Sequence, residues 1–333
     1  MPLPLSLART LLTSTPSDAW LAIFAHALEI AYAPISATRA AGEVTRRDRE
    51  IGALDLFLST SGWDLWSELE TATERTADAL VKWWNERKKN RAVLILDGLS
   101  LRELPWIVQG ANDRGYTVQT VRVTTSELPG DTDSFAQALG LSGRAALENN
   151  GAGSSFRLQK ARTESLNTPW VDAAKAIGSQ PDWVLWHHWP DDRLHDLAKA
   201  GQGIEMLTAS AASELSSDGF WSLVERLTTG RRLIITSDHG YAASGLFPDA
   251  PDDQGKHLKE VFKSGRFASG NKGGPSPWIP PVQLLLTTRR GATRLVLGRR
   301  KWKSQAGYPT LTHGGLSILE VASPFIELSR TEK

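Results

Sequence analysis

The chain has 333 residues, of which 41% are hydrophobic and 23% charged, and its formal net charge is +1. This composition predicts one large α/β domain or two smaller ones, and the near-neutral charge excludes a polyanion binder that acts through bulk charge alone. Because the chain has no cysteine, disulfides and thiolate metal sites are excluded, and a metal ion would have to bind imidazole nitrogen or oxygen atoms.

The chain carries no segment typical of membrane insertion. No apolar run approaches the roughly 20 residues that cross a bilayer. The first 20 residues contain a short apolar stretch interrupted by proline, without the core and cleavage site of a signal peptide. We therefore expect a cytoplasmic protein without a membrane partner.

Residues 1–90 are expected to form an N-terminal helical subdomain. Apolar residues recur at helical spacing in 17–33, and tryptophans and leucines do the same in 61–90. This part of the chain contains no cluster of catalytic residue types. We expect it to act as a cap or docking subdomain on a catalytic domain that spans residues 91–333.

From residue 91 onwards, short apolar runs alternate with helical patterns. Buried strands are expected at 92–96, 116–123, 182–188 and 232–236, and a hairpin at 282–298. The closing segment 314–328 is expected to form a helix that breaks before Pro324. The stretches 141–172 and 246–281, rich in Gly, Ser, Asn or Pro, are expected to be irregular surface loops. The alternation predicts a doubly wound α/β sheet with helices on both faces.

Carboxylates and imidazoles follow the ends of three of these strands. Asp97 follows the first strand, and the pair Asp238 and His239 follows another. Because functional groups gather at the carboxyl edge of a parallel sheet, we expect these side chains to meet there. The full candidate set also contains His187, His188, Asp191, Asp192, His195 and His313. These hard and borderline ligands suit Zn²⁺, with Mn²⁺ and Mg²⁺ as alternatives.

For the second metal site, the sequence allows several sets of ligands. Asp191 and His195 are four residues apart, so on a helix they share one face, and Asp192 with His195 does almost as well. His187 or His188 could also replace His195.

Thr132 is the candidate nucleophile. It lies at the expected start of a helix after a Pro-Gly turn, where a hydroxyl meets the positive end of the helix dipole. The competing interpretation is a helix cap, for which Asp131 is also a candidate.

Four ordered segments resemble the PglZ domain, a branch of the alkaline phosphatase superfamily. They are LILDGL at 94–99, LPGDT at 128–132, IITSDHGY at 234–241 and THGGLSILEV at 312–321. The resemblance covers residues 91–328. A single Asp-His-Gly triplet is weak evidence, but four ordered segments at predicted strand ends form a specific pattern.

The resemblance implies a pair of divalent metal ions and a covalent phosphothreonine intermediate. One metal site would contain Asp97, Thr132, Asp238 and His239, with Thr132 as the nucleophile. The other would contain Asp191, His195 and His313. The implied activity is that of a metal-dependent phosphodiesterase or phosphatase, including nuclease activity on nucleic acid or oligonucleotides. The family is associated with phage defence of the BREX and Pgl kind, which implies protein partners from such a system. The alternative is a non-catalytic binding or scaffold subunit of a defence complex.

One stretch of the chain is strongly basic. Between Lys256 and Lys303 the only acidic residue is Glu260. Two interpretations compete, namely a solvated hairpin with a lid, and a surface that steers anionic substrates towards the metal ions.

Overall fold

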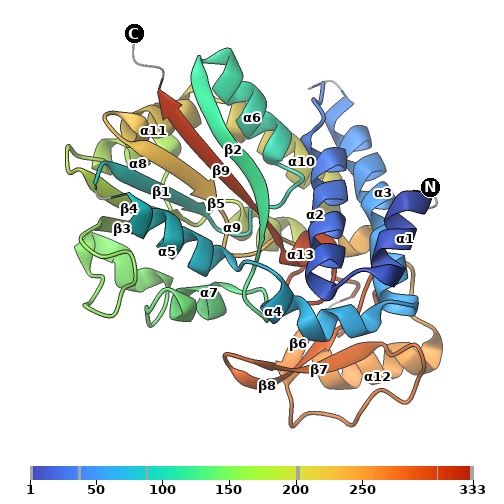
Figure 1. Cartoon of the computed structure of the whole chain (residues 1–333). Coiled ribbons are helices and arrows are strands. Elements are labelled where there is room, and N and C mark those ends of the chain that lie inside the picture. The colour runs from blue at the N-terminus through green and yellow to red at the C-terminus, as the bar shows by residue number, and fades with distance from the viewer. Residues whose placement is uncertain (1–2, 37–38, 88, 200–202, 306, 331–333) are drawn as a thin grey trace.

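The computed structural model describes residues 3–36, 39–87, 89–199, 203–305 and 307–330. Within these residues a six-stranded sheet, of order β2-β9-β5-β1-β4-β3, forms the centre of the molecule (Figure 1), and a three-stranded sheet, of order β6-β8-β7, lies beside it. The strands are β1 (Arg91–Leu96), β2 (Tyr116–Thr125), β3 (Arg162–Leu166), β4 (Asp182–His187), β5 (Arg232–Thr236), β6 (Phe267–Ser269), β7 (Gln283–Thr288), β8 (Gly291–Val296) and β9 (Ala322–Arg330).

Helices cover both faces of the central sheet. The α-helices are α1 (Leu5–Thr13), α2 (Pro16–Tyr32), α3 (Ala40–Thr60), α4 (Leu69–Ala72), α5 (Thr76–Glu86), α6 (Leu104–Asp113), α7 (Thr132–Ala138), α8 (Trp170–Ala176), α9 (Asp191–Lys199), α10 (Gly203–Ser216), α11 (Asp218–Thr228), α12 (Asp252–Phe262) and α13 (Ile318–Val321). The 3-10 helices are η2 (Trp63–Glu68), η3 (Arg144–Asn150) and η4 (Ser244–Leu246).

The sheet is mostly parallel. Strand β1 pairs in parallel with β4 and β5, and β4 pairs in parallel with β3, whereas β9 runs antiparallel to both β5 and β2. All six residues of β1 are buried, which explains its continuous apolar sequence. Leu94 packs into the core under α6, α10 and α11, and Val93 packs on the opposite face with α5 and α7. The predicted α/β class with helices on both faces is confirmed.

The N-terminal helices share a core with the second half of the chain. Apolar residues of α1, α2 and α3 pack with Leu295, Leu297 and Ile318. Buried ion pairs reinforce this contact, because Asp48 of α3 pairs with Arg102 and Arg299. The division of the chain into two domains at residue 90 stays a prediction.

None of the described helices combines the length and the apolarity that a membrane span requires.

Two expectations for the chain were wrong in detail. Residues 141–172 and 246–281 were expected to be irregular, but they contain η3 and β3 in the first case and α12 and β6 in the second. The expected helix 61–90 is instead divided into η2, α4 and α5. The division falls where Arg75 forms an isolated bridge with Thr125 of β2, so a tertiary contact overrides the helical pattern.

The expected closing helix was also wrong. Only Ile318–Val321 is helical, and the following residues form β9, a strand at the centre of the sheet. Pro324 lacks the N–H group that a central strand normally needs. The register explains why it is tolerated: β5 pairs with β9 only from Phe325 onwards, so Pro324 lies opposite Val123 of β2 and beyond the end of β5.

Candidate metal centre

The ends of the parallel strands bring the predicted residues to one edge of the sheet. Asp97 follows β1, and Asp238 with His239 follows the neighbouring β5. The end of β4 is tied to the same place, because the Asp97 N–H donates to the His187 carbonyl at 3.0 Å and the Asp191 N–H donates to the Asp97 carbonyl at 3.0 Å. Asp191 therefore begins α9 directly beside Asp97.

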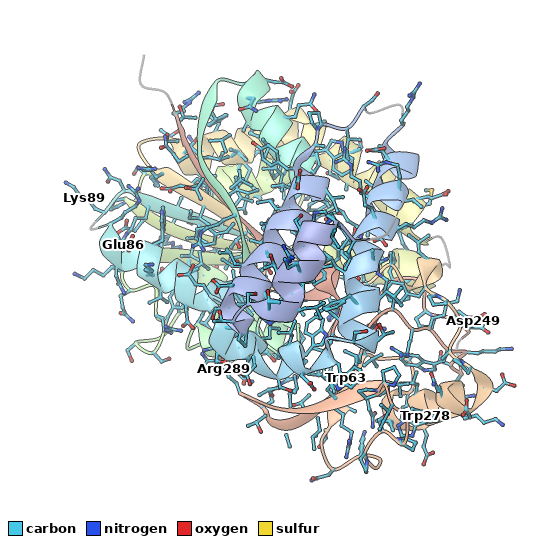
Figure 2. All side chains as sticks on the ribbon, turned by 45° about the vertical axis from the view of Figure 1, so that its right-hand side comes forward. Trp63, Glu86, Lys89, Asp249, Trp278 and Arg289 are labelled. Atoms are coloured by element: carbon cyan, nitrogen blue, oxygen red, sulfur yellow. The ribbon has the colours of Figure 1, made fainter. Side chains whose placement is uncertain are left out.

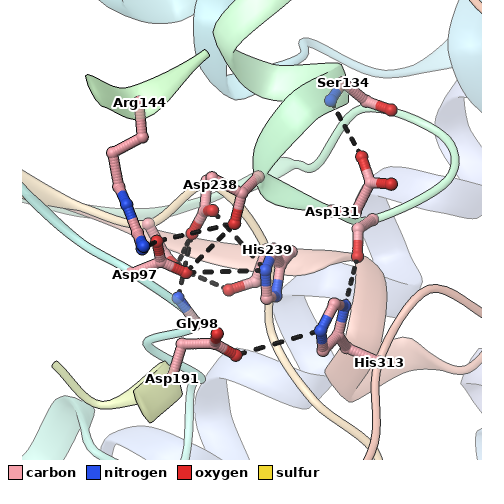
Figure 3. Close-up of polar contacts among 12 residues, drawn as sticks. Asp97, Gly98, Asp131, Ser134, Arg144, Asp191, Asp238, His239 and His313 are labelled. Atoms are coloured by element: carbon pink, nitrogen blue, oxygen red, sulfur yellow. Dashed lines mark hydrogen bonds and ion pairs between the residues drawn. The ribbon is translucent and has the colours of Figure 1, made fainter. Parts of the chain in front are cut away.

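Asp97, Asp238 and His239 form a first group that could hold a metal ion, with one ligand atom from each within 4.8 Å of the others. All three are fully buried. His239 Nε2 lies 3.7 Å from Asp97 Oδ1 and 3.5 Å from Asp238 Oδ2 (Figure 3). The other carboxylate oxygen of Asp238 accepts the Gly98 N–H at 2.9 Å.

Gly98 permits this close approach. Its φ of 73° lies in the left-handed region that other residues rarely adopt. A Cβ atom at this position would lie 3.4 Å from Asp191 Cβ and 3.5 Å from His239 Cε1. Glycine therefore allows the turn after β1 to pass between ligands from two other segments.

Asp191, His239 and His313 form a second group with the same spacing of ligand atoms. The Nδ1 of His313 donates to the Gly130 carbonyl at 3.0 Å, so its Nε2 faces the site, 3.9 Å from Asp191 Oδ1. His239 belongs to both groups, which makes the two candidate sites immediate neighbours. This arrangement suits a pair of ions that act on one phosphoryl group.

His195 lies at the rim of the second group. Its Nε2 is 3.3 Å from Asp191 Oδ2, and its side chain is 49% exposed. Its ring centroid is 5.6 Å from that of His313. The structure thus brings His195 next to Asp191, as the four-residue spacing predicts, and His239 is the imidazole that shares the tight cluster. The role of His195 as a metal ligand stays a prediction.

The alternative ligands that the sequence suggests, Asp192, His188 and His187, contact other groups and not the two candidate metal sites. Asp192 faces His188, with Oδ2 and Nδ1 3.7 Å apart, and His188 Nε2 lies 3.2 Å from the Ser165 hydroxyl. His187 uses both ring nitrogens within the protein, because Nε2 bonds to the Thr168 carbonyl at 2.9 Å and Nδ1 accepts the Trp189 N–H at 3.1 Å. In this geometry Asp191 is the carboxylate that reaches the site.

Thr132 is the first residue of α7, and its hydroxyl faces the first group. Thr132 Oγ1 lies 3.4 Å from Asp97 Oδ1 and 3.5 Å from Asp97 Oδ2. The alternative role of Thr132 as the helix cap is wrong, because Asp131 caps α7 by accepting the Ser134 N–H at 2.8 Å. The Thr132 hydroxyl is therefore left to face Asp97.

Arg144 was not predicted from the sequence. It extends from η3, inside the stretch expected to be irregular, and its guanidinium pairs with Asp97 Oδ2 (Figure 3). The side chain is 22% exposed, so it lies at the open side of the cluster. No motif or spacing marks this arginine, because its position depends on the tertiary path of the loop.

The ionisable groups of the cluster lie close enough to shift the pKa values of one another. Burial, and then the charges of Asp238 and Asp191, raise the pKa of Asp97 well above its usual value, against the lowering effect of Arg144. Burial also raises the pKa of Asp191, but the hydrogen bond to His195 and the charges of His239 and His313 outweigh it and lower this pKa to about 2.

The pKa values of the two central histidines, His239 and His313, shift in opposite directions. Burial lowers the pKa of His239, but the charges of Asp238 and Asp191 dominate and raise it. Burial, followed by the charge of His239, lowers the pKa of His313.

Three candidate ligand atoms at this centre are buried and have no hydrogen-bond partner among the described residues: Asp191 Oδ1, Asp238 Oδ2 and His239 Nε2. A buried polar atom left unpaired costs on the order of 1–3 kcal/mol, and more for a charged group. A pair of bound cations would satisfy all three. Carboxylate oxygen and imidazole nitrogen without sulfur form a ligand set that suits Zn²⁺ and related divalent ions, so the residues fit such a group.

The basic stretch between Lys256 and Lys303 is only partly available to an anion. Its arginines are engaged within the protein: Arg266 pairs with Glu320, Arg299 pairs with Asp48 and Asp55, and Arg294 donates to the Gly273 carbonyl. These contacts serve the packing of the small sheet against the rest of the chain. Most arginines of this stretch are therefore not free to attract an anionic substrate.

No protein-family model matches the chain, and no curated protein sequence matches it. Solved structures similar to it include murine ectonucleotide pyrophosphatase/phosphodiesterase 5, as an inactive variant in complex with AMP, with 14% sequence identity and a TM-score of 0.44 over 72% of this chain and 88% of that chain. A second structure of that murine protein has 14% identity and a TM-score of 0.42, over 72% and 87% of the two chains. Phosphonoacetate hydrolase from Sinorhizobium meliloti 1021, in complex with phosphonoformate, has 14% identity and a TM-score of 0.42, over 71% and 89%. At this level of similarity, the chemistry of the chain has to rest on its own residues.

Proposed function

We propose that the chain is a metal-dependent phosphoric ester hydrolase of the PglZ branch of the alkaline phosphatase superfamily. One observation carries the proposal: Asp191 Oδ1, Asp238 Oδ2 and His239 Nε2 converge, buried and without hydrogen-bond partners, at the carboxyl edge of the sheet. Buried unpaired polar atoms are costly, and cations bound where these three atoms converge would offset that cost. The four PglZ-like sequence segments, which contribute Asp238, His239 and Thr132, support the same assignment.

Asp97, Asp238 and His239 would hold one divalent ion, and Asp191, His195 and His313 the other, because His239 has a single free ring nitrogen, Nε2, and it can bind one ion. When bound, the ions supply positive charge that activates the attacking oxygen and stabilises the leaving oxygen of a phosphoryl transfer. Zn²⁺ suits the mixed carboxylate and imidazole set best.

Thr132 supplies the nucleophile. Its Oγ1 attacks phosphorus, and the bond from phosphorus to the ester oxygen breaks on the opposite side, which leaves a phosphothreonine that water then hydrolyses. The hydroxyl proton has a nearby acceptor, because the Asp97 carboxylate oxygens lie 3.4 and 3.5 Å from Oγ1. The N–H of Ser134 is occupied by Asp131, so α7 holds Thr132 in a fixed orientation.

Arg144 binds the phosphoryl oxygens of the substrate. Its guanidinium reaches the open side of the cluster beside Asp97 and is partly exposed. Arginine is suited to such oxygens because its planar group can donate two parallel hydrogen bonds. In the absence of substrate, the Asp97 carboxylate takes these donors.

The substrate that we propose is a phosphodiester of the nucleotide or oligonucleotide class, in antiviral defence of the BREX or Pgl kind. The resemblance of the four segments to PglZ domains supports this part of the proposal. A partner protein of such a system would then deliver or regulate the substrate.

Elemental analysis combined with a substrate panel tests the proposed function. We expect about two divalent ions per chain and hydrolysis of bis-(p-nitrophenyl) phosphate or of linear or cyclic oligonucleotides. The panel should also include p-nitrophenyl phosphate, which separates a phosphatase from a phosphodiesterase. A metal-loaded protein that hydrolyses no mono- or diester would overturn the proposal.

A further inference from the structure

We propose that the tip of the β7–β8 hairpin (residues 288–291) positions the nucleophile segment (residues 127–133), with Arg290 and Arg289 as positioning residues. This inference rests on the proposed function, because it assigns the segment its role through Thr132. The two parts are distant in the sequence, and Figure 1 shows the hairpin reaching towards α7.

Arg290 holds the acidic residues on both sides of Thr132. Its Nη1 lies 2.7 Å from Asp131 Oδ2, and its Nη2 lies 3.1 Å from Asp133 Oδ2. The other oxygen of Asp131 accepts the Ser134 N–H at 2.8 Å. One carboxylate therefore connects the guanidinium to the first turn of α7, directly at the proposed nucleophile.

Arg289 fixes the other end of the segment. Its Nε donates to Glu127 Oε2 at 2.9 Å, and the Glu127 side chain is only 1% exposed. Arg75 Nη1 lies 3.4 Å from the same oxygen. Figure 2 labels Arg289 at the tip of the hairpin. The buried carboxylate is thus held between two guanidinium groups.

The middle of the segment contacts the metal centre. The Gly130 carbonyl accepts the Nδ1 hydrogen of His313 at 3.0 Å. A shift of the segment would therefore change both the position of Thr132 Oγ1 and the orientation of a metal-ligand candidate. An effect of this kind moves the reacting atoms without removing any of them, and displacements of about 1 Å can cost on the order of 100-fold in rate.

The hairpin is a rigid support for this contact. The β7 and β8 strands pair along their whole length, from Gln283 with Val296 to Thr288 with Gly291. The turn is closed by side chain contacts, because Thr288 Oγ1 donates to the Gly291 carbonyl at 3.0 Å and accepts the Arg290 N–H at 3.1 Å. Side chains positioned by such an element are held more tightly than side chains on an open loop.

The pair of Arg290 with Asp133 contributes little to stability, because the arginine side chain is 30% exposed and that of Asp133 is 63% exposed, whereas the side chain of Asp131 is mostly buried. The inference predicts that loss of both pairs affects the local order of the segment and the turnover rate more than global folding. This difference separates a positioning role from a structural role.

The experiment compares the metal-loaded proteins Arg290→Gln, Arg290→Lys and Arg330→Gln by hydrogen exchange and steady-state kinetics. Arg330 pairs with Glu225 on the surface at 2.6 Å and is a matched control for the loss of one ion pair. In R290Q we expect exchange of the amides of 127–135 to rise at least about fivefold, and kcat to fall about tenfold with a nearly unchanged KM. R290K should recover part of the exchange protection and part of the lost kcat, and R330Q should behave as the wild type.

Equal exchange of 127–135 in R290Q and R330Q overturns the positioning role, and so does an unchanged kcat in R290Q. The failure of the proposed function has a different signature. If the wild type hydrolyses no ester, or Thr132→Ala keeps its turnover, the hydrolase assignment falls, whereas the exchange measurement still decides whether the hairpin orders this segment.

Discussion

The imidazole ring of His313 stacks on that of His239, with ring centroids 4.2 Å apart and ring planes 16° apart. Each ring directs Nδ1 at a backbone carbonyl, that of Gly240 for His239 and that of Gly130 for His313. The Nε2 atoms are therefore left for the carboxylates of the site. Backbone contacts of this kind fix the tautomer and orientation of metal-binding histidines, and they make His239 the common member of both candidate groups.

Replacement of Thr132 tests the nucleophile. Thr132→Ala should reduce kcat by about a thousandfold or more, because the attacking oxygen is removed. Metal content should remain close to that of the wild type, because the carboxylates and imidazoles are unchanged. Thr132→Ser keeps a hydroxyl and should retain measurable turnover. The check is single-turnover kinetics beside elemental analysis, and a T132A protein with wild-type turnover would contradict the assignment.

Removal of metal should destabilise the wild type, because the cation offsets the repulsion among Asp97, Asp191 and Asp238. We expect a chelator to lower Tm by about 5 °C or more, with recovery on addition of Zn²⁺. Asp97→Asn removes a charge that burial and the neighbouring carboxylates disfavour, as the raised pKa of Asp97 indicates, and so it lowers the repulsion in the metal-free protein. The metal-free variant should therefore melt at or above the metal-free wild type, and metal should shift its Tm much less. Differential scanning fluorimetry that gives identical metal-dependent shifts for both proteins would oppose this account.

The buried ion pairs between α3 and the second half of the chain should matter for folding. Arg299 Nε lies 2.6 Å from Asp55 Oδ2, its Nη1 pairs with Asp48, and both carboxylates are buried. Arg299→Met leaves two buried charges without this partner and should lower the free energy of unfolding by about 3–5 kcal/mol. Arg330→Gln, at an exposed pair, should change it by less than about 0.5 kcal/mol. Urea unfolding measures both, and equal effects would refute the proposed importance of the buried network.

His187 should make stability depend on pH. Burial lowers its pKa to about 4 in the folded protein, compared with about 6.5 when unfolded. The unfolded state therefore binds the proton first. The stability contribution is complete above pH 6.5, is lost as pH falls towards 4, and amounts to at most about 3 kcal/mol. His187→Gln should flatten the slope of unfolding free energy between pH 6.5 and 4. Parallel curves for the two proteins would show that His187 does not contribute.

The candidate site residues that the structure brings together at one edge of the sheet share a simple physical signal. Asp97, Asp238 and His239 follow buried parallel strands, and neighbouring strands must place such residues at one edge. Asp191 has the same origin, because it follows β4. The burial of β1 on both faces also made its continuous apolar run easy to recognise.

The errors have equally specific causes. The segment Ala322–Arg330 mixes apolar residues with Ser323, Glu327 and Ser329, so its pattern does not distinguish a buried strand from a helix. Arg144 and Arg290 reach the site by tertiary contacts with Asp97 and Asp131, which no local pattern encodes. The sequence also does not show which arginines of the basic stretch are paired, because their acidic partners, such as Glu320 and Asp48, lie outside that stretch.

The most direct test of the central claim is a crystal structure of the metal-loaded protein, with anomalous scattering data collected at the absorption edge of the bound metal. The account predicts two anomalous peaks about 4 Å apart, one beside Asp97, Asp238 and His239 and the other beside Asp191 and His313, with the Thr132 hydroxyl directed at them. Crystals grown in excess Zn²⁺ that show no peak among these residues would contradict it.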